Sequence, residues 1–384
     1  MKVLHFKTTM DLEEGGVVKA VLDLIRVSAV SDSIGLSSVD AAGLPQEWSK
    51  GLPVAVHELK GNVTRAGVLT RAQLNELERI IAGYDVVHLH SMWPTANPQV
   101  AKICKGLHKP YILSVHGMLD DWCMSQRRLK KLAYMKTWGR DLLRGASYIH
   151  CTAQAELDQA SAWFEPSKGV VIPLPFDLSE YRDLPGDDLA YKTFEGLKHD
   201  CPKVLFLSRI HYKKGIDRLI RASALLKDRG FEHQLVIAGT GDDSYVKQMQ
   251  SLAKQVGINN HVYFLGFASG RSKVSLLQAC ELFALPTSQE NFGFVFFESL
   301  AAGTPVVTTR GTDTWPEIKQ SGGGVIVDNE PEAFADAIQM LLRKPELVSS
   351  MGLRGQDWAM SAFESDRILQ QYQALYLRTM GDMG

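Results

Sequence analysis

The sequence predicts an α/β protein with two doubly wound parallel-sheet domains, and three observations support this prediction. Short apolar runs alternate with helical periodicity along both halves of the chain, which is the pattern of strand–helix–strand units in a parallel sheet. The length of 384 residues is typical of two domains of ordinary size. Residues 178–202 are polar and rich in Asp, Pro and Gly, and they interrupt the alternation where a linker is expected.

The composition excludes several classes of protein. Hydrophobic residues make up 45% and charged residues 22%, as in an ordinary globular protein, and the formal net charge of −1 predicts no nucleic-acid partner. The five cysteines are scattered and odd in number, which disfavours a disulfide framework and predicts a cytoplasmic location. The chain starts without a long apolar run and contains no stretch of about 18 apolar residues, so neither a signal peptide nor a membrane-spanning helix is expected.

The first half shows five strand signals, with helical text such as residues 72–82 between them. The expected strands are residues 3–6, 85–90, 111–115, 148–151 and 170–172. Gly15 and Gly16 follow the first strand, and a helix over residues 17–30 follows them. A Gly-Gly pair in this position makes a tight turn that exposes backbone N–H groups to a ligand, or it is a plain turn. We expect residues 1–175 to form the first domain and residues 176–202 the linker.

Three histidines on or directly after strands of the first domain are candidate site residues. His116 follows the strand at 111–115, at the sheet edge where doubly wound proteins bind ligands, so it is a candidate donor to a substrate hydroxyl or phosphate. A structural histidine is the alternative. His88 and His90 alternate along one strand and share a face. No Asp, Glu or Cys lies near them at ligand spacing, so packed histidines explain the pair better than a metal site does.

A basic stretch, residues 127–138, interleaves Arg and Lys with apolar and aromatic side chains. Its spacing is typical of a helix that covers the sheet and turns a charged face outward, which is the interpretation we prefer. The alternative is a helix that lies on an anionic membrane surface and contacts it through Arg127, Arg128, Lys130 and Lys131.

The second half repeats the alternation and is expected to form a domain over residues 203–360. The expected strands are residues 204–210, 234–239, 261–267, 280–285, 305–308 and 322–327, and the expected helices are residues 216–227, 293–303, 332–342, 345–351 and 365–380. Cations, glycines and glutamates of this half fall at the junctions between strands and helices. Ligands of doubly wound sheets bind at such junctions.

Three cations, Arg209, Lys213 and Lys214, lie between a strand and the N-terminus of the next helix. The helix dipole disfavours a cation there by about 0.3–1 kcal/mol. A polyanion bound at this end of the helix explains their position, and three solvated charges are the alternative. Gly241 follows the next strand and permits close approach of the backbone to a ligand, and Phe267 ends the strand after that.

Two glutamates flank the start of the helix that follows the strand at 280–285. Glu290 lies in the loop, and Glu298 lies eight positions later inside the helix. They are about 12 Å apart if the stretch is helical, whereas a glycosidase carboxylate pair needs roughly 5 to 9.5 Å. Between them, the backbone N–H groups of residues 292–294 form an anion site. A nucleotide sugar, with a phosphate between two hydroxyl-rich ends, fits this arrangement; an acidic loop with a solvated glutamate is the alternative.

Taken together, these motifs resemble the retaining glycosyltransferases of family four, which have the GT-B fold. The resemblance extends from about residue 2 to about residue 375, and the following residues carry it: Glu13-Glu14-Gly15-Gly16, His116-Gly117, Arg209 with Lys213-Lys214-Gly215, Gly239-Thr240-Gly241, and the run from Glu290 to Glu298, spaced as E-x7-E. It implies two Rossmann-like doubly wound domains that face each other across a cleft. It also implies that a terminal helix, in residues 361–384, crosses back to the first domain.

The resemblance implies a role for each site residue. Arg209 and Lys214 resemble the diphosphate clamp, Glu290 a ligand of the donor sugar, and His116 the first-domain histidine beside the sugar; these four are the expected catalytic residues. Glu298 resembles the carboxylate that binds the ribose. The expected donor-binding residues are Gly15, Gly16, Gly241, Phe267, Asn291, Phe292, Gly293, Phe294 and Glu298.

The implied reaction moves a hexose from a nucleotide sugar, expected to be UDP-glucose or another UDP-hexose, to a saccharide or lipid-linked glycan acceptor with the anomeric configuration retained. Such transfer belongs to polysaccharide or glycoconjugate synthesis. Fixed cations can stabilise the leaving diphosphate, and no D-x-D motif occurs, so no metal and no other cofactor are expected. The alternatives are a nucleotide-sugar epimerase of the same fold, a transferase that uses an ADP- or GDP-sugar, and a non-catalytic binding module.

Overall fold

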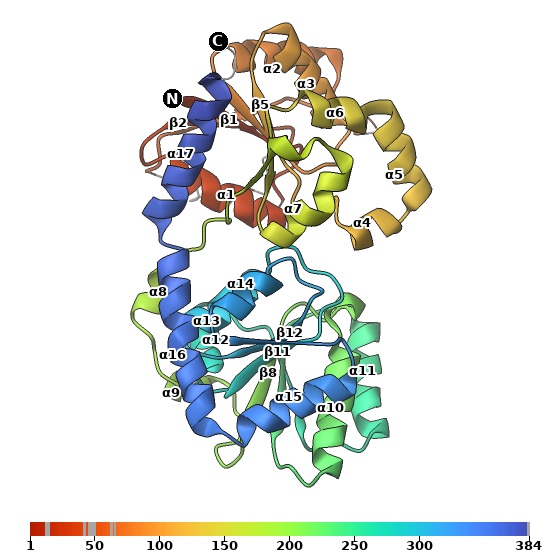
Figure 1. The fold of residues 1–384 in the computed structure, drawn as a ribbon, viewed down its shortest axis with the longest axis vertical. Coiled ribbons are helices and arrows are strands. Elements are labelled where there is room, and N and C mark those ends of the chain that lie inside the picture. The colour runs from red at the N-terminus through yellow and green to blue at the C-terminus, as the bar shows by residue number, and fades with distance from the viewer. Residues whose placement is uncertain (12–15, 41–43, 45–50, 62–63, 65–66, 382–384) are drawn as a thin grey trace. The chain divides into compact units, whose positions relative to one another are not determined.

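The chain forms two compact units, each built on one parallel sheet, in a computed structural model (Figure 1). The structure describes residues 1–11, 16–40, 44, 51–61, 64 and 67–381. Unit 1 comprises Met1–Phe176 together with Ser365–Gly384, and unit 2 comprises Asp177–Glu364.

Unit 1 contains a seven-stranded sheet in the order β3-β2-β1-β4-β5-β6-β7. Its strands are β1 Lys2–Phe6, β2 Ser33–Ser38, β3 Val54–Glu58, β4 Val86–His90, β5 Tyr111–Ser114, β6 Tyr148–Cys151 and β7 Gly169–Val171. Its helices are α1 Gly16–Ser28, α2 Arg71–Ala82, α3 Ala96–Gly106, α4 Asp121–Ser125, α5 Arg128–Tyr134, the π-helix η2 Met135–Gly139, α6 Arg140–Gly145, α7 Gln154–Ala160, two 3-10 turns, η3 Ser161–Trp163 and η4 Pro166–Lys168, and α17 Ser365–Gly381. The strand order reverses between β1 and β4, which places a ligand-binding position beyond their carboxyl ends.

The centre of unit 1 is buried from both sides. Every residue of β4, β5 and β6 is buried, as expected for parallel strands that helices cover on both faces. A capping box between Thr70 and Gln73 starts α2, because each residue's side chain bonds the other's backbone N–H. The C-terminal helix α17 packs against α1 and β4 and contributes Tyr372 and Tyr376, which are fully buried.

Unit 2 contains a six-stranded parallel sheet in the order β10-β9-β8-β11-β12-β13. Its strands are β8 Lys203–Leu207, β9 Gln234–Ala238, β10 Val262–Gly266, β11 Leu282–Leu285, β12 Val306–Thr309 and β13 Gly324–Val327. Its helices are α8 Ser179–Arg182, α9 Asp188–Thr193, the 3-10 turn η5 Tyr212–Lys214, α10 Ile216–Asp228, α11 Asp243–Gln255, α12 Gly270–Gln278, α13 Phe294–Ala301, α14 Trp315–Gln320, α15 Pro331–Leu342 and α16 Pro345–Ala362. The order reverses between β8 and β11, so the loops after these two strands flank the switch point.

One predicted helix does not cover a sheet. α5 has no buried residue, and Leu129 within it is 83% exposed, so the interpretation of this stretch as a sheet-covering helix is wrong for Arg128–Tyr134. The helix follows Arg127, which has a left-handed backbone (φ 51°), and it packs against α4 and η2. Its apolar side chains Leu129 and Leu132 are therefore left at the surface. Among the described residues, no helix combines the length and the apolar character needed to cross a bilayer.

Candidate active site

The predicted cations and the first glutamate meet at the carboxyl edge of the unit 2 sheet. Lys214 ends η5, the turn that follows β8, and Glu290 lies in the loop that follows β11. The Lys214 Nζ donates to the Glu290 Oε2 in an ion pair. Because β8 and β11 are the two strands at the switch point, the chain places this pair where doubly wound sheets bind ligands.

The Lys214 ammonium is in an electrostatically costly position. Its residue is 8% exposed, and burial, with the charges of Arg209 and Lys213, lowers the pKa of Lys214 to about 8. Arg209 is exposed and forms no ion pair with another described residue. A bound polyanion would relieve the repulsion among the three cations, and this is the arrangement expected of an anion site.

The Glu290 loop is held by backbone hydrogen bonds. The Glu290 N–H donates to the carbonyl of Gly311 (2.7 Å), and the Glu290 carbonyl accepts from the N–H of Asp313 (3.0 Å). The Asn291 side chain donates to the Asp313 Oδ2 at 3.0 Å. The loop after β12 therefore fixes the backbone that carries the Glu290 carboxylate.

The helix α13 begins at Phe294, with Gly293 as its N-cap in a left-handed backbone (φ 64°). A Cβ at position 293 would lie 2.6 Å from the Phe296 ring, so only glycine fits there without strain. The N–H groups of Phe292, Gly293 and Val295 donate to no other described residue. These amides lie two to five positions after the ion-paired Glu290 and, with the positive end of the helix dipole, suit an anion.

Glu298 lies within α13 and has a partner that the sequence analysis missed. The Lys273 Nζ of α12 lies 2.9 Å from the Glu298 Oε1, and both side chains are largely buried. The two glutamates therefore have separate cationic partners, Lys214 and Lys273. No sequence signal pointed to Lys273, because α12 itself was not predicted.

The structure gives the two remaining predicted residues of unit 2 different surroundings. Gly241 pairs with Ile210 in an isolated parallel bridge, and a Cβ at 241 would lie 2.1 Å from the Ile210 carbonyl oxygen. This glycine therefore has a packing role, in which it joins the loops after β8 and β9. Phe267 follows β10, is 72% exposed and makes no ring contact with another described residue.

The predicted residues of unit 1 are placed as follows. His116 follows β5, has a left-handed backbone (φ 50°) and is 7% exposed. The next residue, Gly117, donates its N–H to the buried Glu156 Oε1 at 2.5 Å. Gly16 begins α1, is exposed and has open space where a side chain would be. Gly15 lies outside the described residues.

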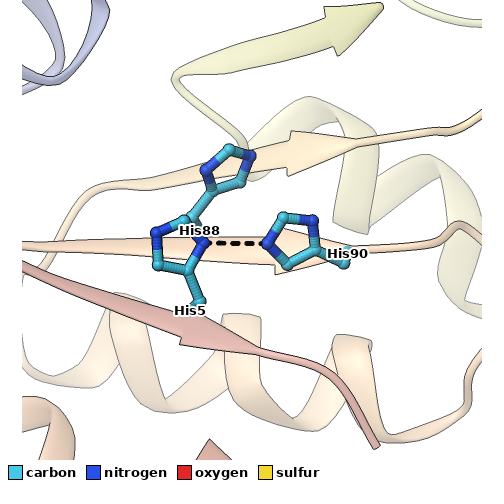
Figure 2. Close-up of side chains that lie close together, drawn as sticks. All are labelled: His5, His88 and His90. Atoms are coloured by element: carbon cyan, nitrogen blue, oxygen red, sulfur yellow. Dashed lines mark hydrogen bonds between the residues drawn. The ribbon is translucent and has the colours of Figure 1, made fainter. Parts of the chain in front are cut away.

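His116 belongs to a cluster of buried histidines, of which Figure 2 shows three. The rings of His5, His88 and His90 are fully buried or nearly so, and their candidate ligand atoms lie within 4.8 Å of one another. Five of their six ring nitrogens already have hydrogen-bond partners, which are Tyr376, Ser114, His116 and, for His5 and His90, each other. A metal ion would have to displace these bonds, so the interpretation of His88 and His90 as packed histidines agrees with the structure.

The models of two protein families match the chain. "Glycosyl transferases group 1" matches residues 188–358, and "Glycosyl transferase 4-like domain" matches residues 21–175. The chain is 31% identical over 283 residues to a D-inositol 3-phosphate glycosyltransferase of Corynebacterium jeikeium, which covers 70% of this chain and 66% of that one. It is 27% identical over 276 residues to an uncharacterised glycosyltransferase of Methanocaldococcus jannaschii, with 67% and 66% covered. The matches with these two relatives span just under two thirds of their lengths.

Solved structures show the same fold. Anabaena HepE in complex with UDP has a TM-score of 0.80 at 21% identity, covering 98% of this chain and 99% of that one. Sucrose-phosphate synthase from Thermosynechococcus elongatus has a TM-score of 0.77 at 18% identity over the full length of both chains. Together with the two Rossmann-like units, this likeness confirms the predicted GT-B fold class.

Proposed function

Because the chain belongs to the group 1 glycosyltransferases of the family-four type, we propose that it transfers a hexose from a nucleotide sugar to a saccharide or lipid-linked glycan. UDP-glucose is the first candidate donor, and polysaccharide or glycoconjugate synthesis is the expected context. Structures of the HepE neighbour contain UDP, UDP with glucose, and UDP-glucose, which supports a UDP-hexose as the donor of this chain. We expect retention of the anomeric configuration and no requirement for a metal.

One observation supports this proposal most strongly: the partly buried ion pair of Lys214 and Glu290 at the switch point of unit 2, next to the N-terminus of α13. In the proposed complex the donor diphosphate replaces Glu290 as the partner of Lys214. It also pairs with Arg209 and accepts hydrogen bonds from the amides at the start of α13. Glu290, released from Lys214, accepts hydrogen bonds from hydroxyl groups of the hexose. Glu298 binds the ribose hydroxyls while Lys273 holds its carboxylate in place.

The chemistry follows from these positions. Cleavage of the glycosidic bond to the diphosphate leaves negative charge on the leaving oxygen, and an oxocarbenium-like centre develops on the sugar. Once the donor is bound and Lys214 has left Glu290, Lys214, Arg209 and the α13 amides are in place to stabilise the leaving charge, so the bond cleavage itself needs no further reorganisation. His116 donates a hydrogen bond to the sugar. Gly16 begins α1, which follows β1, and β1 is one of the two strands at which the order of the unit 1 sheet reverses. In this position Gly16 would contact a phosphate or the acceptor.

The direct test is a turnover assay with variants of the clamp. Lys214→Ala and Glu298→Ala should each lower kcat/KM for the nucleotide sugar by about 100-fold or more, which is the range for removal of one preorganised electrostatic contact. Lys247→Ala removes an exposed lysine of α11 and is the matched control, with activity unchanged. Full activity in both clamp variants would refute the assignment.

The alternative activities give different products. A nucleotide-sugar epimerase would convert the donor without any acceptor, and a binding module would show affinity without turnover. A panel of UDP-, ADP- and GDP-sugars in a thermal-shift assay separates the donors, because a ligand that binds the folded state raises Tm. The GDP-sugar alternative has some support, since another relative is a GDP-mannose-dependent mannosyltransferase of Mycolicibacterium smegmatis.

We also propose a peripheral contact with anionic membranes through α5 and the residue that precedes it. The predicted contact residues are Arg127, Arg128, Lys130 and Lys131. The exposed Leu129 supports this role, as does Trp138, which is 48% exposed in η2. Flotation with vesicles containing anionic lipid should carry the protein at low salt, and Leu129→Glu should reduce the bound fraction several-fold. Equal binding to neutral vesicles, or none to either kind, would contradict this proposal.

A further inference from the structure

His116 is the outer member of a chain of three buried imidazoles. The His5 Nδ1 lies 3.0 Å from the His90 Nε2, and the His90 Nδ1 lies 3.2 Å from the His116 Nε2. Figure 2 shows the first of these hydrogen bonds. The rings come from β1, from β4 and from the second position after β5, and these strands are neighbours in the sheet. The hydrogen-bonded chain of imidazoles therefore runs from the interior of the sheet to its carboxyl edge.

All three imidazoles are neutral near pH 7. Burial lowers the pKa of His5 and of His116 to about 3 and lowers the pKa of His90 well below its usual value. A neutral imidazole has one N–H donor and one bare nitrogen that accepts. Two consecutive hydrogen bonds between imidazoles therefore run in the same direction, either outward to His116 or inward to His5.

The surroundings of His5 select the outward direction. Its Nε2 is sealed from solvent and has no hydrogen-bond partner in the part of the chain that the structure describes. The inward direction would place an N–H at this atom, and buried N–H groups without an acceptor are rarer than buried acceptors without a donor. The outward direction leaves a bare nitrogen there and puts the proton of His116 on Nδ1.

The Nδ1 of His116 is in a different situation. It forms no hydrogen bond with another described residue and, unlike the His5 Nε2, it is not sealed from solvent. The N–H at this position is therefore free for a ligand, while Nε2 is occupied by His90.

We propose that His5 and His90 are positioning residues that hold the proton of His116 on Nδ1, so that His116 presents a fixed N–H donor to a hydroxyl group of the transferred hexose. The role in transfer rests on the proposed function, whereas the position of the proton does not. Because Nε2 is engaged with His90, His116 acts as a hydrogen-bond donor and not as a general base.

A second hydrogen-bonded chain in the same core provides the control. His150 donates from Nε2 to the Ile172 carbonyl (2.8 Å), so its Nδ1 accepts from Ser114, which in turn accepts from the His88 Nε2. This second chain ends at Tyr376 of α17 and has no hydrogen bond to His116. Ser114→Ala interrupts it and leaves the first chain intact.

The test is a long-range ¹H–¹⁵N spectrum of histidine-labelled protein, which distinguishes an Nδ1–H from an Nε2–H imidazole. His116 should be in the Nδ1–H form in the native protein and in Ser114→Ala. His5→Leu removes the first donor, and His116 should then lose its single tautomer. His5→Asn supplies an amide N–H near the position of the imidazole Nδ1–H and should restore it. An Nε2–H form in the native protein, or the same form in all variants, would overturn the proposal.

Kinetics separate this proposal from the proposed function. His5→Leu should lower kcat by roughly 10- to 100-fold, the range for loss of a partner that orients an imidazole. The affinity for UDP, which lacks the hexose, should stay within twofold, and His5→Asn should recover most of kcat. If the native protein turns over no nucleotide sugar, the proposed function fails while the spectrum still decides the position of the proton. Stoichiometric Zn²⁺ binding with loss of the His5–His90 hydrogen bond would show that these imidazoles bind a metal and do not form the proposed hydrogen-bonded chain.

Discussion

At the scale of single residues, the site is set by charges that the fold holds in unfavourable surroundings. Lys214 is buried, lies among other cations and is paired with the Glu290 carboxylate. The cost of such a position is offset when a ligand adds negative charge. Lys214 therefore links the electrostatics of the free protein to the proposed binding of a diphosphate.

The lowered pKa of Lys214 predicts a pH dependence of UDP binding. Burial and the neighbouring cations lower this pKa to about 8, so the ammonium is lost from the free protein as pH rises through 8. The affinity for UDP should be constant at lower pH and should fall above pH 8 by at most about tenfold per unit, the limit for one linked proton. Titration calorimetry from pH 7 to 9.5 measures it. Lys214→Arg keeps its charge throughout and should abolish the dependence; an unchanged slope in that variant would exclude Lys214 as its origin.

Lys273 is expected to act on the donor through Glu298. Lys273→Met keeps much of the side-chain volume and removes the cation that lies 2.9 Å from the Glu298 carboxylate. Because the Glu298 carboxylate is then less constrained, KM of this variant for the nucleotide sugar should be about tenfold higher, equivalent to roughly 1.4 kcal/mol, with little change in kcat. Arg271→Met on the same helix is the control, because Arg271 is half exposed and pairs with Asp183. Equal KM values for the two variants would leave Lys273 without a role.

At the scale of elements, the start of α13 carries most of the proposed phosphate site. Gly293→Ala would force a Cβ into a left-handed backbone and against the Phe296 ring. We expect a loss of about 1–3 kcal/mol in the free energy of unfolding, measured in denaturant, together with weaker UDP binding. Gly106→Ala, at the end of α3 with open space around it, should change neither quantity. A Gly293→Ala protein with native stability and affinity would show that this backbone geometry is not required.

The sequence predicted elements well where periodicity was strong and poorly where context decides. The runs at β4, β6 and β8 are buried along their whole length, and their predicted positions are confirmed to within a few residues. The strands β2 and β3 were missed because Ser33–Ser38 is rich in serine and Val54–Glu58 is a largely exposed edge strand. The helix signal in residues 127–138 was real, but the side on which α5 packs depends on tertiary contacts that no periodicity encodes.

The candidate site shows the same division. Lys214 and Glu290 were identified from their positions at strand ends, and the parallel sheet brings them into contact. Lys273 and His5 were not identified, because their proximity to Glu298 and His90 arises from contacts between distant segments. The sequence therefore predicted the site residues that lie at strand ends, but it did not predict Lys273 and His5, which contact other site residues from distant segments.

At the scale of the whole molecule, the histidine cluster links stability to pH. Burial lowers the pKa of His5 and His116 to about 3 and that of His150 to about 4, below the value of about 6.5 expected in an unfolded chain. The unfolded chain therefore binds more protons between these values, and stability should fall as pH decreases from about 6.5. Each such histidine contributes up to about 1.4 kcal/mol per pH unit. Denaturant unfolding between pH 7 and 5.5, where most carboxylates stay ionised, measures the effect; a flat profile would contradict the neutral cluster.

The proposed function requires that Lys214 and the start of α13 bind the donor pyrophosphate. A crystal structure of the protein with UDP-glucose tests this claim most directly. We predict pyrophosphate oxygens about 3 Å from the Lys214 Nζ and from backbone N–H groups at the start of α13, with the Glu290 carboxylate turned to the glucose hydroxyls. A pyrophosphate bound elsewhere, with the Lys214–Glu290 pair intact, would contradict the account.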